Sequence, residues 1–285
     1  MQRAIRDQTI KDFGAQWTRF TDNDGYYGSA AMLDDLFGEL IDLDRLRDAR
    51  VADIGAGTGR FVQILLQRGA QHVIAVEPSA AMDILKQNTL AERNRVTYIH
   101  APGEDLPPDE SLDFVFSIGV LHHVPDPSAV VESAYQALRP GGHMLVWLYG
   151  REGNATYLTF ALPLRALVKG GPHWLLNSLV WVLYFPIAAY IRLCRRFRLP
   201  MRRYMQEVLG QFSPTKIRLV IYDQLKPSYS KYYRRAEAVA LLEREGFRNV
   251  RAYHRHGYSW SVCGTKGEPV CSRDISSNGE SSTPV

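Results

Sequence analysis

Short apolar runs alternate with amphipathic segments over residues 50–150 of this 285-residue chain. The runs have the length and β-branched content of buried strands, and the segments between them carry apolar residues at helical spacing. The expected strands are 51–53, 72–76, 96–99, 112–118 and 143–149, and the expected helices are 60–68, 79–93 and 128–139. Strands and helices that alternate through short connections predict an α/β fold. Its sheet is doubly wound and mostly parallel, and it binds ligand at the carboxyl ends of the strands.

Two more strands are expected near the C-terminus, where a helix over 235–245 precedes the runs 250–255 and 258–265. A tight turn between these runs makes an antiparallel hairpin, which completes a seven-stranded sheet. The expected organisation is an N-terminal lid or helical segment (1–48), a ligand-binding core (49–150), an apolar and basic helical insertion (151–231), the last helix and closing hairpin (232–266) and a disordered tail (267–285).

Three glycines, Gly55, Gly57 and Gly59, follow the first strand at every second position. They permit a tight turn and let a ligand lie against main-chain N–H groups at the start of the next helix. A dinucleotide-binding loop needs its third glycine one place later, where this chain has Arg60.

Led by Asp53, this loop resembles the cofactor loop of class I S-adenosylmethionine-dependent methyltransferases, of the bacterial type 11-like group. The resemblance is strong over 50–150 and moderate over 232–266. It implies a Rossmann-like methyltransferase that uses S-adenosyl-L-methionine and no metal.

Acidic residues after the second and third strands complete the implied cofactor site. Glu77 is placed to accept hydrogen bonds from ribose hydroxyls, and the resemblance gives the adenine amino group to Glu104 or Asp105, with Asp105 favoured. Alternatively, these residues are helix caps or solvated turns. The implied cofactor-binding residues are Asp53, Gly55, Ala56, Gly57, Gly59, Glu77, Pro78, Met82, Glu104, Asp105, Ile118, Gly119, Trp17 and Arg19.

His122, His123 and Tyr27 are the catalytic candidates. The two histidines follow the fourth strand on the ligand side, where a neutral imidazole suits removal of a proton from an alcohol acceptor. His123 matches a catalytic histidine of the phosphobase methyltransferases, and Tyr27 resembles their latch tyrosine in an aromatic lid over the cofactor. Alternatively, the histidines only shape the pocket and the N-terminal segment is ordinary packing. An amphipathic helix is expected over 32–43.

Charge is unevenly distributed within the small net value of +4: residues 1–150 carry −8 and residues 151–235 carry +12. The basic segment also contains 22 uncharged residues from Gly170 to Ile191, which as a helix would extend about 33 Å, near the thickness of a bilayer core. A membrane-spanning helix is disfavoured, because the last helix and hairpin must return to the same sheet and Pro186 interrupts the run.

Three interpretations of the insertion remain open: contact with an anionic membrane surface through the following arginines, a cap on an apolar acceptor pocket, or an ordinary buried helix pair. No nucleic-acid partner is expected, because the aromatic residues are not interleaved with the arginines. Tyr229, Tyr232 and Tyr233 are expected to line the acceptor pocket. The absence of a signal segment and three scattered cysteines (Cys194, Cys263, Cys271) favour the cytoplasm, with attachment to the inner face of the membrane.

The expected function is SN2 methyl transfer to an oxygen, or a nitrogen, of a hydrophobic or lipid- or phosphate-linked small-molecule acceptor. The alternatives are a natural-product or sugar methyltransferase without a membrane role, an NAD(P)-dependent oxidoreductase, and a non-catalytic cofactor-binding scaffold. The sequence predicts neither the acceptor nor the oligomeric state.

Overall fold

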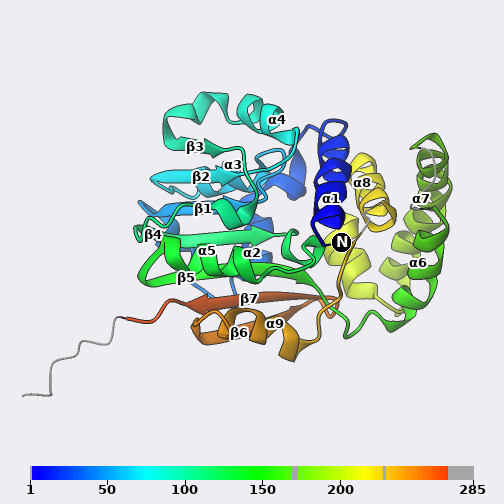
Figure 1. The fold of residues 1–285 in the computed structure, drawn as a ribbon. Coiled ribbons are helices and arrows are strands. Elements are labelled where there is room, and N and C mark those ends of the chain that lie inside the picture. The colour runs from blue at the N-terminus through cyan, green and yellow to red at the C-terminus, as the bar shows by residue number, and fades with distance from the viewer. Residues whose placement is uncertain (1, 169–172, 227–228, 269–285) are drawn as a thin grey trace, which may run out of the picture.

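The computed structural model describes residues 2–168, 173–226 and 229–268 and has a seven-stranded sheet at its centre, in the order β3-β2-β1-β4-β5-β7-β6. The strands are β1 (Arg50–Ile54), β2 (His72–Val76), β3 (Val96–Ile99), β4 (Leu112–Ile118), β5 (Leu138–Tyr149), β6 (Arg248–Arg255) and β7 (Ser259–Thr265). β1 to β5 pair in parallel, and β7 runs antiparallel to both β5 and β6 (Figure 1). The predicted α/β fold class, mostly parallel with an antiparallel C-terminal hairpin, is confirmed.

Helices cover both faces of this sheet, as a doubly wound fold requires. On one face, α2 (Ala30–Phe37), α3 (Arg60–Gln67) and α4 (Ala81–Asn88) bury a core that includes Leu33, Ile64 and Leu85. On the other face, α5 (Ser128–Ala137) and α9 (Arg235–Glu243) bury a second core that includes Val131 and Leu242. The amphipathic spacing in the sequence therefore matches two real packing faces.

Three local expectations differ from the structure. The helix expected over 32–43 ends at Phe37, and a separate 3-10 turn (Leu43–Leu46) begins where the Asp42 side chain accepts a hydrogen bond from the Asp44 N–H. The helix expected over 79–93 is shorter and is followed by a 3-10 segment (Leu90–Arg95). β5 begins at Leu138 instead of 143, because Leu138 already pairs with Leu112 before a register shift. Most of the expected disordered tail lies outside the described residues.

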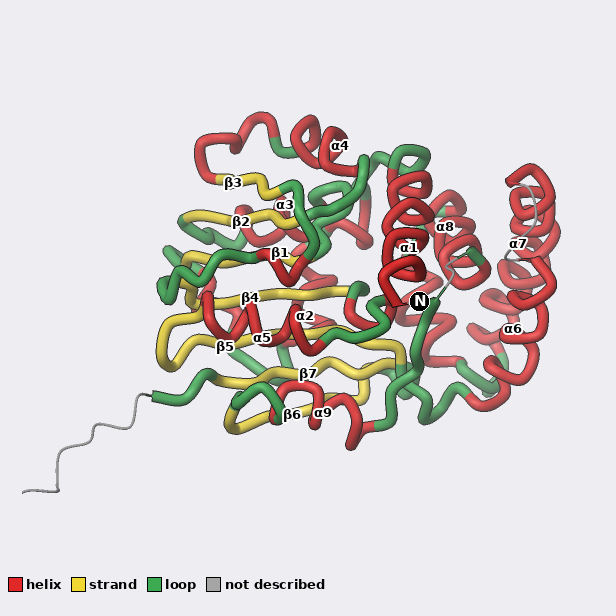
Figure 2. The backbone as a smooth tube through the Cα atoms, in the orientation of Figure 1, coloured by secondary structure: helices red, strands yellow, loops and turns green. Residues whose placement is uncertain are grey.

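The insertion between β5 and α9 is helical and lies beyond the strand ends, next to α1 (Gln2–Trp17), as Figures 1 and 2 show. It contains α6 (Ala155–Val168), α7 (His173–Arg196), a π-helical turn (Tyr204–Val208), a 3-10 turn (Leu209–Gln211) and α8 (Pro214–Leu225). Its own small core includes Val180 and Ile191 of α7 with Ile217 and Ile221 of α8. The insertion is therefore packed against the strand ends at which the fold binds ligands.

Candidate functional site

Two adjacent pockets lie at the carboxyl ends of the strands. The first, which we call the loop pocket, is formed by the ends of β1, β2 and β4 under α1, and its lining includes Gly55, Glu77 and Gly119. Its empty volume is about 830 Å³, with open solvent at the mouth included.

The glycine loop forms one wall of the loop pocket. Gly55 and Gly57 have positive φ values of 76° and 54°, which glycine adopts without strain. A Cβ atom at Gly55 would lie 2.3 Å from a methyl carbon of Val120, so there is no room for a larger residue. The Gly57 N–H donates to Glu77 Oε2 at 2.8 Å, which fixes the loop against the end of β2.

Glu77 has two roles in this geometry. Its other oxygen accepts hydrogen bonds from the N–H of Ser79 at 2.9 Å and from the Ser79 hydroxyl. A carboxylate offers about four acceptor sites, so Glu77 keeps capacity for a ligand hydroxyl while it holds the loop.

Asp53, at the end of β1, has a buried oxygen without a hydrogen-bond partner. The side chain is 2% exposed, and its Oδ2 atom has no partner within the described residues. Burial raises the pKa of this carboxyl group to about 7, with a further contribution from Glu77 against the lowering effect of Arg60. A cationic group of a ligand at this position would stabilise the charged form of Asp53.

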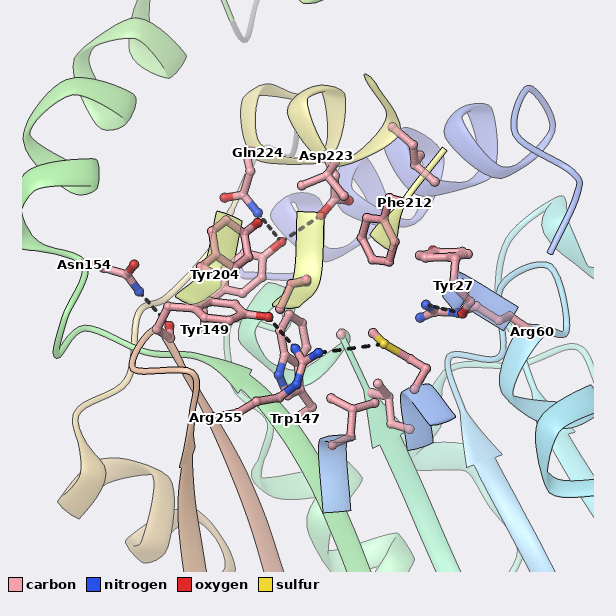
Figure 3. A pocket seen from close by; sticks show the side chains of 18 of the residues that line it. Tyr27, Arg60, Trp147, Tyr149, Asn154, Tyr204, Phe212, Asp223, Gln224 and Arg255 are labelled. Atoms are coloured by element: carbon pink, nitrogen blue, oxygen red, sulfur yellow. Dashed lines mark hydrogen bonds between the residues drawn. The ribbon is translucent and has the colours of Figure 1, made fainter. Parts of the chain in front are cut away.

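The second pocket, which we call the aromatic pocket, lies between the sheet and the insertion and has an empty volume of about 1110 Å³ on the same measure. Its wall includes Trp147 and Tyr149 from the end of β5 and Tyr204 and Phe212 from the insertion (Figure 3). At one side, the Tyr149 hydroxyl donates to Asp223 Oδ2 at 2.7 Å. It also accepts from Gln224 Nε2 at 2.9 Å. The pocket is therefore mainly aromatic with a small polar cluster.

The two pockets meet beneath α1. Four residues line both of them: Phe13, Trp17, Ile118 and Gly119. A group that passes from a ligand in one pocket to a ligand in the other would cross at these residues.

Polar contacts hold α1 over both pockets. Arg6 forms an ion pair with Glu104 beside the loop pocket, and Gln16 Nε2 donates to Asp223 Oδ1 at 3.1 Å beside the aromatic pocket. Lys226 Nζ lies 3.5 Å from Asp12 Oδ1. The N-terminal helix therefore has the position of a lid.

Half of the cofactor-binding residues expected from the sequence line the loop pocket, and the structure places the rest elsewhere. The lining residues are Trp17, Gly55, Glu77, Pro78, Glu104, Ile118 and Gly119. Asp53, Ala56, Gly57 and Gly59 belong to the loop and strand end behind them, and Met82 is in the core.

Asp105 and Arg19 lie outside both pockets. Asp105 is exposed on a 3-10 turn whose preceding residue, Glu104, lines the loop pocket. Successive side chains on such a turn point about 120° apart, so only one of the two acidic residues faces the pocket. Arg19 is exposed and interacts with the Tyr222 hydroxyl.

The two histidines have different surroundings. His123 lines the loop pocket, and its Nδ1 lies 2.8 Å from the main-chain oxygen of Tyr229. As donor, Nδ1 leaves Nε2 unprotonated and able to accept a proton. Burial lowers the pKa of His123. His122 is fully buried, stacks on Tyr149 with ring centroids 3.8 Å apart and lines neither pocket.

Tyr27 lines the aromatic pocket and does not line the loop pocket. Its ring lies 3.8 Å from the Arg60 guanidinium carbon and packs edge-on against Phe212. Tyr232 lines the same pocket, as expected from the sequence. Tyr229 and Tyr233 do not line it.

Arg60, Asp223 and Gln224 line the aromatic pocket but were not predicted from the sequence. In the sequence, Arg60 stands out only because it occupies the position at which a dinucleotide-binding loop has its third glycine. Gln224 and Asp223 gave no signal of their own, because the packing of α8 against the strand ends brings them to the pocket.

Comparison with known proteins assigns the region around the loop pocket to a family. Residues 52–146 match the family model described as a methyltransferase domain. A ubiquinone biosynthesis O-methyltransferase from Alkalilimnicola ehrlichii is 28% identical over 185 residues, which cover 61% of this chain and 73% of that protein. A tRNA U34 carboxymethyltransferase from Alteromonas mediterranea is 32% identical over 123 residues, 41% of this chain. This match spans only 37% of the tRNA enzyme's length.

A solved structure has the same fold. The S-adenosylmethionine-dependent methyltransferase SibL, in its apo form, superposes with a TM-score of 0.50 at 17% identity. The superposition covers 84% of this chain and 56% of that one. It extends the agreement from the matched domain to most of the architecture described above.

Proposed function

The chain belongs to the class I S-adenosylmethionine-dependent methyltransferases, and we propose that it transfers a methyl group to an oxygen of a hydrophobic acceptor. The observation that carries the proposal is the pair of pockets that share Phe13, Trp17, Ile118 and Gly119. Such a pair holds a donor and an acceptor side by side, which is what a single displacement requires.

The residues of the loop pocket fit the family's cofactor. Glu77 has free acceptor capacity for a ribose hydroxyl, and the unpartnered Asp53 oxygen suits an ammonium group beyond the glycine loop. We assign the contact with the adenine base to Glu104 rather than Asp105, because only Glu104 lines the loop pocket. S-adenosylmethionine would therefore supply a partner for each of these three carboxylates.

When bound, S-adenosylmethionine supplies a sulfonium methyl group, so the acceptor oxygen forms the new C–O bond with a lone pair while the S–C bond electrons go to sulfur. The protein aligns the acceptor and removes its proton. Nε2 of His123 is the group that we assign to the proton, because the hydrogen bond to Tyr229 leaves this nitrogen unprotonated. The lid formed by α1 excludes water from the crossing point.

We expect His123→Ala to lower kcat by about 10²-fold or more and to leave the affinity for S-adenosylhomocysteine almost unchanged. His123→Asn is the matched variant, because its amide can donate to Tyr229 as Nδ1 does but lacks Nε2. Since burial lowers the pKa of His123, the base stays unprotonated at neutral pH, and wild-type kcat should fall only below about pH 6.5. Full activity of the His123→Asn variant would show that His123 only lines the pocket and does not act as the base.

An oxygen acceptor of aromatic character is supported by the wall of the aromatic pocket and by the similarity to ubiquinone biosynthesis O-methyltransferases. The ring surfaces of Trp147, Tyr149, Tyr204 and Phe212 offer stacking partners for a planar acceptor. A nitrogen acceptor has less need of a general base such as His123, so we propose oxygen before nitrogen as the methylated atom.

We further propose that the enzyme works at the inner face of a membrane, with α7 lying on the bilayer surface. The segment Trp174–Arg196 is long and apolar enough to cross a bilayer by length and composition, but its C-terminal neighbours return to the same sheet. Only 17% of the apolar 18-residue stretch within this segment is buried inside the protein. Trp174, Trp181 and Phe185 are 69%, 49% and 63% exposed.

These three aromatic residues share one side of α7 with two arginines. At about 100° per residue, Trp174, Trp181, Phe185, Arg192 and Arg196 fall within about 60° of one another. An exposed aromatic stripe that ends in basic residues is typical of a helix at an anionic lipid surface. The same location gives access to a hydrophobic acceptor.

We expect the protein to co-sediment with vesicles that contain phosphatidylserine and not with vesicles of phosphatidylcholine alone. Raising the salt concentration from 0.1 to 0.5 M should release much of the bound protein, because basic residues at the surface contribute about 1 kcal/mol each and are screened. Equal binding to both vesicle types, or none to either, would remove the membrane role and leave α7 as a cap.

A tRNA acceptor is the second candidate function, favoured by the similarity to tRNA U34 carboxymethyltransferases. The expectation of no nucleic-acid partner is therefore open to test. Arg218 of α8 lies over the Trp181 ring, but the exposed rings of α7 precede the arginines of that helix, which favours the lipid surface. A band-shift titration with unmodified tRNA tests this second candidate, and competition between tRNA and vesicles shows whether the two use the same surface.

The proposed function is tested by incubating cell extract with the protein and methyl-labelled S-adenosylmethionine, followed by mass spectrometry of lipid, small-molecule and RNA fractions. The proposal predicts label on an oxygen of a hydrophobic compound in the lipid or small-molecule fraction. Label in RNA alone would replace the acceptor proposed here. Tighter binding of NADH than of S-adenosylmethionine would remove methyl transfer itself.

A further inference from the structure

One arginine in the aromatic pocket lacks a counter-ion. Arg60 begins α3 directly after the glycine loop, and its guanidinium carbon lies 3.8 Å from the ring centroid of Tyr27 and 4.2 Å from that of Phe61. One nitrogen donates to the Tyr27 main-chain oxygen at 3.3 Å. Across the described ranges, no carboxylate lies within ion-pair distance of Arg60. Most of its five N–H donors are therefore available to a ligand.

A second arginine of the same pocket shows the contrast. Arg255 is paired with Asp35 and bonded to the Tyr258 hydroxyl. Tyr258 and Asp35 raise the pKa of Arg255 in spite of its burial. Burial lowers the pKa of Arg60, and its more distant acidic neighbours compensate only in part. Of these two guanidinium groups, only that of Arg60 needs an anion from outside the protein.

The position of Arg60 assigns this anion to the acceptor. Arg60 lines the aromatic pocket and is not part of the loop pocket, where Gly55 and Glu77 lie. Figure 3 shows Arg60 beside Tyr27 on one side of the aromatic pocket and Asp223 on another, with aromatic rings between them. Asp223 is held by Tyr149 and Gln16. The pocket therefore has a positive side and a negative side.

We propose that Arg60 binds a carboxylate carried by the acceptor, so that the acceptor is a phenolic acid whose hydroxyl faces the Asp223 side. The inference rests on the proposed function and names its substrate class. Guanidinium and carboxylate groups form paired hydrogen bonds in one plane. Asp223 repels the carboxylate, which excludes the reversed orientation. Arg60 is therefore a specificity residue of the acceptor site.

The contribution of the carboxylate charge to binding is measured with two probes of nearly equal shape. They are 3,4-dihydroxybenzoate and its neutral amide, 3,4-dihydroxybenzamide. Each is titrated calorimetrically into the full-length protein saturated with S-adenosylhomocysteine. We expect the wild type to bind the benzoate at least about tenfold more tightly than the amide. Arg60→Gln should bring this ratio close to one, and Arg60→Lys should retain part of it.

Arg68→Gln is the matched control, because Arg68 ends the same helix and pairs with Asp34 at the surface; its benzoate-to-amide ratio should equal the wild-type ratio. The affinity of Arg60→Gln for S-adenosylhomocysteine should stay within about twofold of the wild type. The inference is overturned if the wild type shows no preference for the benzoate, whether both probes bind or neither does. It is also overturned if Arg60→Gln keeps the preference, or if this variant loses S-adenosylhomocysteine, since Arg60 would then serve the cofactor. Failure of the wild type to bind S-adenosylhomocysteine would instead refute the proposed function.

Discussion

Replacing Gly57 by arginine is expected to abolish cofactor binding. Gly57 has a φ of 54°, a region that residues other than glycine enter at a cost. A Cβ atom there would already lie 3.4 Å from Nε1 of Trp17 on the lid, so a longer side chain would fill the space between loop and lid. The Gly57 N–H also anchors Glu77. We expect the affinity for S-adenosylhomocysteine to fall by more than about 100-fold, measured by calorimetry.

Gly257→Arg is the control for backbone strain. Gly257 has a φ of 76° in the turn between β6 and β7, and a Cβ atom there would meet nothing within 4 Å. This variant should bind S-adenosylhomocysteine as the wild type does. If Gly57→Arg retained normal affinity, the glycine loop would not be the cofactor site.

Removing the aromatic stripe of α7 is expected to weaken membrane binding strongly. Trp174, Trp181 and Phe185 are at least 49% exposed, so changing all three to serine removes little core packing. Partial burial of each ring in a lipid interface contributes about 1 kcal/mol or more. The triple variant should therefore bind phosphatidylserine vesicles about 10²-fold more weakly than the wild type.

Leu90→Ser provides the control, because Leu90 is 61% exposed but belongs to the 3-10 segment after α4 and not to the insertion. It should bind vesicles normally. The triple variant and Leu90→Ser should both bind S-adenosylhomocysteine with wild-type affinity, since neither α7 nor Leu90 contributes to either pocket. Unchanged vesicle binding by the triple variant would show that the arginines act without the stripe or that another surface makes the contact.

Most of the fold could be predicted because the apolar pattern of each strand and the residues that end it lie within a short stretch of sequence. β2, β3 and β4 begin and end at the predicted residues, since apolar strands end where the chain becomes polar or turns. The start of β5 could not be predicted. Arg139, Pro140 and two glycines are local stop signals, yet Leu138 pairs with β4 before them and His143 after them, so a tertiary contact overrides the local pattern.

The candidate site was predictable where a motif encodes it and unpredictable where packing creates it. Glu77 and the glycine loop have a fixed spacing along one βαβ unit. Asp223 and Tyr204 reach the pocket only because the insertion folds back over the strand ends. His122 and His123 are neighbours in sequence, but a 3-10 turn sends one side chain into the core and the other to the loop pocket.

The central claim is that the loop pocket holds the methyl donor next to the aromatic pocket. A crystal structure of the protein with S-adenosylhomocysteine tests it most directly. We predict ribose hydroxyls on the Glu77 carboxylate, and the thioether sulfur between Gly55 and Gly119, facing the crossing residues Phe13 and Trp17. The account would be contradicted by a ligand bound elsewhere, or by a sulfur atom turned away from the aromatic pocket.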